Sequence, residues 1–251
     1  TEGIGPAAAR NRAIAAAGAE LVAFLDADDA WHPGKLRRQI AFHQANPSVG
    51  FSFTDYIHVA LDGRPLGTCF EYWSCGWTTQ SSGDYVLIDD AEAKLLATNL
   101  VGTSTVVARR GALEAVGGFS PLCRSAEDWD LWLRLAAAAK VGFSASLTMS
   151  YLMRPGSETA GRERRIASLR DIANRYRHRR DPAIHRALRV ARARMAVAEA
   201  EHLRECGNFQ LAARAQLKAL SLSPDWRTCK GVAANLLGSG RNLLERATAK
   251  S

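Results

Sequence analysis

The sequence predicts an α/β domain followed by an all-helical region. Helix-forming and strand-forming segments alternate from the beginning of the chain to about residue 157, which is typical of a sheet flanked by helices. Residues 158–251 are rich in helix formers and contain no strand candidate. With 251 residues, 47% of them hydrophobic and 23% charged, the chain is long enough for one sizeable core and a smaller second part.

Within the α/β part, each expected element follows from a local pattern. An alanine-rich stretch predicts a helix over residues 6–17, and the apolar run ELVAFL predicts a short buried strand over residues 20–25. Pro33 opens a helix that ends before Asn46-Pro47, and VGFSFTDYIHV predicts a second strand over residues 49–59. Further helices are expected over residues 89–97, 111–116 and 127–139, and further strands over residues 104–108 and from 141 onward.

The C-terminal region is divided by residues that stop helices. Breaks fall at Asp181-Pro182, Gly207-Asn208 and Ser223-Pro224. The two helices that flank Gly207 carry small and apolar residues at helical spacing, which resembles one tetratricopeptide-like hairpin. A single hairpin needs neighbours to bury its faces, so we favour a helical bundle packed on the α/β domain over a repeat array.

The composition excludes several classes of protein. No apolar run is long enough to span a bilayer, and the five scattered cysteines form no CxxC pair, so neither a zinc knuckle nor a redox pair is indicated. Reduced thiols predict a cytoplasmic protein. The net charge of +8 is concentrated after residue 154, which fits a solvated helix face or peripheral association with the inner face of an anionic membrane. We expect no nucleic-acid partner, because the basic stretches carry few aromatic residues and no recognition motif.

A first acidic cluster follows the predicted strand over residues 20–25. Asp26, Asp28 and Asp29 come directly after it, and ligands of open α/β sheets bind beyond the carboxyl ends of strands. Clustered carboxylates repel one another, and a divalent cation would relieve that repulsion. Hard oxygen ligands suit Mg²⁺ or Mn²⁺. The alternative is a polar turn that caps the next helix.

A second acidic cluster, Glu127-Asp128-Trp129-Asp130, begins a predicted helix. The helix dipole favours acidic residues in a first turn, which accounts for part of this acidity. It does not account for the bulky Trp129 and Trp132 beside the carboxylates. A carboxylate next to aromatic rings is partly desolvated, which raises its pKa and makes it a better base.

Taken together, the two clusters resemble those of a known family. The run GPAAARNRAIAAAGAELVAFLDADDAWHPGKLRRQI, which begins at Gly5, is similar to the DxD region of inverting family 2 glycosyltransferases, and GGFSPLCRSAEDWDLWLRLA, which begins at Gly117, is similar to their Gly-Gly-Phe and Glu-Asp segments. The resemblance covers residues 3–157. It implies a GT-A-like (Rossmann-like) mixed sheet over residues 1–157 that lacks its first strands, followed by the helical region over residues 158–251.

The resemblance also implies a role for individual residues. Asp28 matches the aspartate that contacts the metal, Mg²⁺ or Mn²⁺, and Asp26 the aspartate near the ribose and diphosphate of a nucleotide-sugar donor. Asp128 matches the base that deprotonates the acceptor hydroxyl for displacement with inversion, and Glu127 would shape the acceptor site. The pair Arg10 and Asn11 matches an Arg-Asn pair close to the nucleotide; a helix surface and a helix-loop hydrogen bond are the alternatives for it.

Aromatic residues supply candidates for the acceptor site. Trp129, Trp73 and Trp77 would line it and stack on the sugars of a glycan or lipid-linked acceptor, whereas for Trp132 we expect a core position. The alternative for the irregular loop that holds Trp73 and Trp77 is a segment pinned by buried aromatic side chains.

The sequence departs from the family pattern at two places, and these departures favour an alternative, non-catalytic function. Nothing before Thr1 resembles the family's first strand, which holds the nucleotide base. Arg154 stands where many members carry a Tyr-Arg-x-His segment; it could bind phosphate but could not ligate a metal. The alternative function is therefore a decayed, non-catalytic transferase that binds carbohydrate or protein. The intact acidic clusters favour the enzyme.

Overall fold

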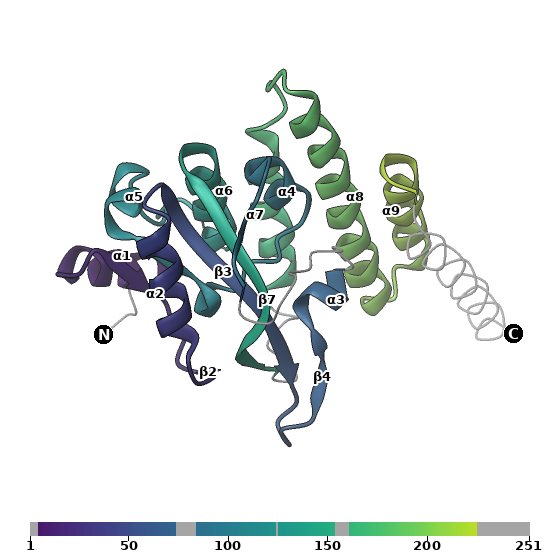
Figure 1. Cartoon of the computed structure of the whole chain (residues 1–251). Coiled ribbons are helices and arrows are strands. Elements are labelled where there is room, and N and C mark those ends of the chain that lie inside the picture. Colours follow the sequence, from purple (N-terminus) through teal and green to yellow (C-terminus); the bar gives the residue numbers. More distant parts are fainter. Residues whose placement is uncertain (1–4, 74–83, 124, 154–160, 225–251) are drawn as a thin grey trace, which may run out of the picture. The chain divides into compact units, whose positions relative to one another are not determined.

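The computed structural model describes residues 5–73, 84–123, 125–153 and 161–224 (Figure 1). The chain divides into two compact units, residues 1–155 and residues 156–251. The first unit is built on a mixed sheet, and the second is helical in its described part. None of the described helices combines the length and apolar composition needed to cross a membrane.

The first unit is organised around two long strands, β3 (Val49–Val59) and β7 (Lys140–Leu152), which pair in parallel (Figure 1). The strand order is β1-β6-β3-β7-β2, with β4 paired to β3 and β5 paired to β7. All these pairs other than β3–β7 are antiparallel. The shorter strands are β1 (Leu21–Ala23), β2 (Asp29–Trp31), β4 (Pro65–Thr68), β5 (Val86–Leu87) and β6 (Val107–Arg109).

Helices connect the strands and supply the rest of the core. Pro6 at the first position of its helix is pre-organised for a helical turn, because its fixed φ fits and its missing N–H would have no partner there. In the helix that begins at Glu127, the first turn carries Glu127, Asp128 and Asp130, whose negative charges complement the helix dipole. The helical elements of the first unit are α1 (Pro6–Ala16), α2 (Lys35–Ala45), α3 (Cys69–Trp73), α4 (Ala91–Ala97), the 3₁₀ helix η1 (Thr103–Thr105), α5 (Arg110–Ala115) and α6 (Glu127–Ala138).

One face of the sheet carries an aromatic core under α6. Trp132 is fully buried, and its ring lies 5.4 Å from that of Phe51 on β3. Phe24 and Phe119 contact the same indole edge-on, at 5.9 and 6.1 Å. This confirms the expected core position of Trp132. Burial of such large apolar surfaces is the main stabilising contribution in this unit.

The second unit contains a helical hairpin. Its described helices are α7 (Arg162–Asn174), α8 (Pro182–Glu205) and α9 (Phe209–Leu222). The side chain of Asp181 caps α8 by accepting a hydrogen bond from the Ala183 amide, and Gly207 takes a positive φ of 76° at the turn into α9. Small side chains at Ala200, Ala212 and Ala215 let α8 and α9 approach closely. Membership of this hairpin in a repeat array stays a prediction.

The observed elements confirm the predicted fold class, an α/β mixed sheet flanked by helices and followed by a helical part. The strand over residues 49–59 has the predicted bounds. The strand expected over residues 104–108 was placed too early: residues 103–105 form η1, and pairing with β1 begins at Val107. Local β-propensity in this segment is overridden because η1 turns the chain before it enters the sheet.

Candidate functional site

Arg10 on α1 joins the two acidic clusters. One guanidinium nitrogen donates to Asp26 Oδ1 at 2.7 Å and the other to Glu127 Oε1 at 3.0 Å. Burial opposes the positive charge, but the hydrogen bond to Asp26 and the charges of Asp26, Glu127 and Asp128 together raise the pKa of Arg10. Asp26 and Glu127, which are more than a hundred positions apart in the chain, therefore contact the same guanidinium group.

The 3₁₀ helix η1 provides a second link, because adjacent residues bind one cluster each. Thr103 donates its hydroxyl to Asp128 Oδ2 at 3.3 Å. Ser104 donates to Asp29 Oδ2 at 2.5 Å and accepts from the Asp26 amide at 3.0 Å. The indole of Trp31 fixes η1 further by donating to the Ser104 carbonyl at 2.6 Å. Both carboxylate clusters thus share one rigid support.

The carboxylates of the first cluster have different environments. Asp28 is exposed, whereas Asp29 is partly buried and its Oδ1 has no hydrogen-bond partner among the described residues. Burial raises the pKa of Asp29 to about 6. The negative charges of Asp26 and Asp28 also raise this pKa, whereas the hydrogen bond from Ser104 lowers it. A buried carboxylate oxygen without a partner, close to a second exposed carboxylate, is suited to a hard divalent cation.

A cation held here would depend on substrate for most of its ligands. The described residues contain no group of three or more His, Cys, Asp or Glu side chains arranged for a metal ion. Two carboxylates are nevertheless a suitable protein contribution for Mg²⁺, which usually keeps water and phosphate oxygens as its other ligands. The residues present therefore fit a metal that binds together with a diphosphate.

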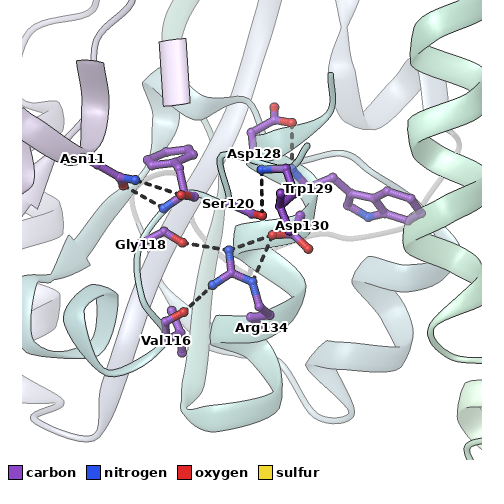
Figure 2. A network of polar contacts seen from close by, with 10 residues as sticks. Asn11, Val116, Gly118, Ser120, Asp128, Trp129, Asp130 and Arg134 are labelled. Atoms are coloured by element: carbon purple, nitrogen blue, oxygen red, sulfur yellow. Dashed lines mark hydrogen bonds and ion pairs between the residues drawn. The ribbon is translucent and has the colours of Figure 1, made fainter. Parts of the chain in front are cut away.

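Asp128 lies in the first turn of α6, where it is partly exposed. Its Oδ1 accepts from the Trp129 amide at 2.7 Å (Figure 2). Its Oδ2 accepts from the Thr103 hydroxyl. The N-cap residue of α6, Ala126, adopts a left-handed conformation with φ 57°, an uncommon and strained backbone geometry for alanine. The carboxylate is oriented by backbone and hydroxyl donors and stays accessible.

A polar network behind Asp128 fixes the start of α6 to the Gly-Gly-Phe turn (Figure 2). Arg134 pairs with the buried Asp130 at 2.7 Å and donates to the carbonyls of Val116 and Gly118 at 2.5 and 2.7 Å. Gly118 has a positive φ of 65°, and a Cβ there would lie 2.5 Å from Asn11 Oδ1. Only glycine fits this contact.

Asn11 connects α1 to the same turn. Its amide nitrogen donates to the Phe119 carbonyl at 2.8 Å, and its Oδ1 accepts from the Phe119 amide at 2.8 Å. This reciprocal pair is the helix-loop hydrogen bond that the sequence left open as the alternative for Asn11. The pair places Arg10 one residue earlier on α1, where it contacts both acidic clusters.

The tryptophans expected at the acceptor site have different surroundings. Trp129 is only 3% exposed, and its indole donates to the Leu95 carbonyl at 2.9 Å, so it packs α6 against α4. Trp73 is partly exposed at the end of α3. Trp77 and Arg154 lie outside the described residues.

Two residues of the site were missed by sequence reasoning. Ser104 opens the segment that was predicted as a strand, residues 104–108, and Thr103 directly precedes it, so their hydroxyls were not considered as donors. The one available signal was the polar triplet TST directly before the apolar residues of β6. Its contacts with both clusters are non-local and depend on the tertiary fold.

Comparisons with known proteins show what this chain is similar to. Residues 1–92 match the model of the family described as glycosyl transferase family 2. A glycosyltransferase assigned to teichuronic acid biosynthesis, TuaG of Bacillus subtilis, is 35% identical over 145 residues, which are 57% of this chain and 49% of that protein. The pre-mycofactocin glycosyltransferase of Mycobacterium tuberculosis is 31% identical over 143 residues, 55% of this chain and 28% of that protein. The chain thus spans half or less of the length of these relatives.

A solved structure shares the fold. The mannosyltransferase PcManGT of Pyrobaculum calidifontis, in complex with GDP-Man and Mn²⁺, aligns with a TM-score of 0.56 at 21% identity, covering 97% of this chain and 61% of that one. This likeness confirms the GT-A-like fold class. The sequence match over residues 1–92, the relatives named as glycosyltransferases and the shared fold together support the predicted resemblance of the first unit to family 2 glycosyltransferases.

Proposed function

We propose that the protein transfers a sugar from a nucleotide-sugar donor to a glycan or lipid-linked acceptor, with inversion at the anomeric carbon. The observation that carries this proposal is that the Arg10 guanidinium forms ion pairs with both Asp26 and Glu127. A donor-binding cluster and an acceptor-activating cluster have to be neighbours for a direct displacement. The relatives' names and the complex of PcManGT with GDP-Man and Mn²⁺ support the same chemistry.

Asp128 is the base of the proposed reaction. Its carboxylate takes the proton of the acceptor hydroxyl while that oxygen forms a bond to the anomeric carbon. The bond from the anomeric carbon to the diphosphate breaks, and its electron pair leaves with the nucleoside diphosphate. Thr103 and the Trp129 amide orient the carboxylate for this step, and Glu127, held by Arg10, shapes the acceptor side.

The first cluster serves the donor. Asp28 and Asp29 would hold Mg²⁺ or Mn²⁺, and a bound ion supplies neutralisation of the charge that develops on the diphosphate leaving group. Asp26 is kept in place by Arg10 and by Ser104 and lies on the donor side of the site. We assign Asn11 the positioning of α1, and Trp73 and Trp77 remain proposed acceptor-side residues. The buried Trp129 packs α6 against α4, so the expectation that its ring lines the acceptor site is corrected. Arg154 remains a proposed phosphate ligand.

The substitution Asp128→Asn tests the assigned base. In the full-length gene product we expect a loss of transfer of roughly 10²- to 10⁴-fold, because a general base is removed while its shape is kept. Nucleotide-sugar binding, measured by calorimetry with Mn²⁺, should be nearly unchanged. Asp62→Asn, at an exposed turn, is the matched control and should keep full activity.

Two outcomes would contradict the proposal at different levels. Full transfer activity in Asp128→Asn would reject Asp128 as the base. Absence of any Mn²⁺-dependent sugar-nucleotide turnover in the wild-type protein, with glycan binding retained, would favour the non-catalytic binding module.

We also propose that the second unit associates peripherally with the cytoplasmic face of an anionic membrane, where lipid-linked acceptors lie. The supporting observation is an exposed run of basic residues, Arg177 to Arg180, between α7 and α8. Sedimentation with vesicles of phosphatidylglycerol and phosphatidylcholine should show binding that decreases with salt. Equal binding to purely zwitterionic vesicles would contradict it.

A further inference from the structure

Three aromatic rings gather on β3 and β7 at the site. The ring centroids of Tyr56 and His58 lie 5.1 Å apart, those of His58 and Tyr151 5.6 Å, and those of Tyr56 and Tyr151 6.1 Å. Tyr151 is 41% exposed, which is unusual for a large ring on a strand that is mostly buried. None of these residues was predicted from the sequence as part of the site.

Strand pairing places this cluster beside the first acidic cluster. Tyr151 is the direct partner of Asp29 in the antiparallel β2–β7 pair and the direct partner of His58 in the parallel β3–β7 pair. Directly paired residues project from the same face of a sheet. Asp29, Tyr151 and His58 therefore lie in one row on one face.

The third ring reaches toward the second acidic cluster. A Cβ placed on Gly102 would lie 2.8 Å from the Tyr56 ring, so the ring packs directly on this glycine backbone. The next residue, Thr103, donates to Asp128. Burial, followed by contributions from Cys69, Tyr151 and Asp128, raises the pKa of Tyr56 well above its usual value, so the phenol stays neutral beside the carboxylates.

We infer that Tyr151, backed by His58 and Tyr56, is a binding platform for the pyranose ring of a sugar, an inference that rests on the proposed function. A pyranose has an apolar face of C–H groups and a rim of hydroxyls. A partly exposed aromatic ring suits the first, and the Asp29 carboxylate next to Tyr151 in the row suits the second. Tyr56 and His58 act as positioning residues, because they fix the Tyr151 ring.

Saturation-transfer NMR on the full chain tests the platform without requiring catalysis. The probes are methyl α-D-mannopyranoside and methyl β-D-glucopyranoside, as mimics of an acceptor, and in a second arm GDP-mannose and UDP-glucose with Mn²⁺, as donors. We expect saturation of ring C–H protons in at least one arm. The arm that responds distinguishes an acceptor sugar from a donor sugar.

Substitutions at Tyr151 separate stacking from folding. Tyr151→Leu keeps apolar bulk but removes the ring, and should weaken binding roughly 3- to 10-fold, whereas Tyr151→Phe should bind as the wild type does. Leu147→Ala, on the same strand with a similar exposed fraction of 40%, is the control and should have no effect. Native-state hydrogen exchange checks that each variant is folded.

The result that would overturn the platform is unchanged binding in Tyr151→Leu in both arms, or no binding of any probe by the wild type. Failure of the proposed function is separately visible. If the protein binds glycosides through Tyr151 but shows no Mn²⁺-dependent turnover, the platform is supported and the transferase function is rejected. If it shows turnover but Tyr151→Leu has no effect on binding, the transferase function is supported and the platform is rejected.

Discussion

The two faces of the β3 strand are packed by opposite chemistry. Phe51 and Phe53 project into the aromatic core under α6, where Trp132 is fully buried. Ser52 and Thr54 project to the other face, which α2 covers. The α2 side chains on this face are Lys35, Gln39 and His43, and each has 1% or less of its surface exposed. One face is held by apolar burial, and the other by a hydrogen-bonded polar row.

At the centre of the polar row under α2, both ends of the Gln39 amide group have hydrogen-bond partners. Gln39 Oε1 accepts from Lys35 Nζ at 2.7 Å, and its amide nitrogen lies 3.1 to 3.2 Å from Ser52 and from the Thr105 carbonyl of η1. Lys35 Nζ also lies 4.7 Å from the centre of the Trp31 ring. The row thus supports η1 and Trp31, which in turn hold the site, whereas the aromatic face supplies bulk stability.

The largest effect is expected on the aromatic face. Trp132→Ala should destabilise the first unit by about 3–5 kcal/mol, since it leaves a large cavity among Phe24, Phe51 and Phe119. Hydrogen exchange of the β3 amides measures this unit on its own. Trp132→Phe is the control with a smaller loss, because Trp132 Nε1 has no hydrogen-bond partner among the described residues. Equal losses in both variants would show that aromatic bulk does not stabilise this face.

A smaller loss is expected on the polar face. Gln39→Leu keeps the volume but leaves the Lys35 ammonium and the Thr105 carbonyl without their partner, at a cost of about 2–3 kcal/mol. The same substitution at the exposed Gln44, on the same helix, should change stability by less than about 0.5 kcal/mol. A neutral or stabilising Gln39→Leu, measured by the same exchange experiment, would mean that this face tolerates an apolar core.

The most specific effect concerns pH. Burial lowers the pKa of Lys35 from 10.5 to about 7. Between pH 7 and 10.5 the unfolded state binds more protons at this residue than the folded state, so the contribution of Lys35 to stability rises with pH in that window. Lys35→Met should remove this rise, because methionine carries no titratable group. Urea unfolding of both proteins between pH 7 and 10.5 checks it, and parallel pH profiles would contradict it.

The same contrast explains which parts could be predicted. The strand over residues 49–59 and the helix that begins at Glu127 follow from local apolar patterns and a charged first turn, and the structure shows both at those positions. The burial of Lys35, Gln39 and His43 has no such signal, because polar residues spaced four apart on a helix normally face solvent. Their partners come from β3 and η1.

The sequence by itself determined the order of elements, the two acidic clusters and the family they resemble, because these depend on residue types at short spacing. Only the tertiary structure decided that Arg10 is shared by Asp26 and Glu127, that Thr103 and Ser104 support one cluster each, and that Tyr151 stands beside Asp29. The physical reason is that each of these contacts joins strands or helices that are distant in the chain. Their geometry is fixed by sheet register and close packing, which no local pattern specifies.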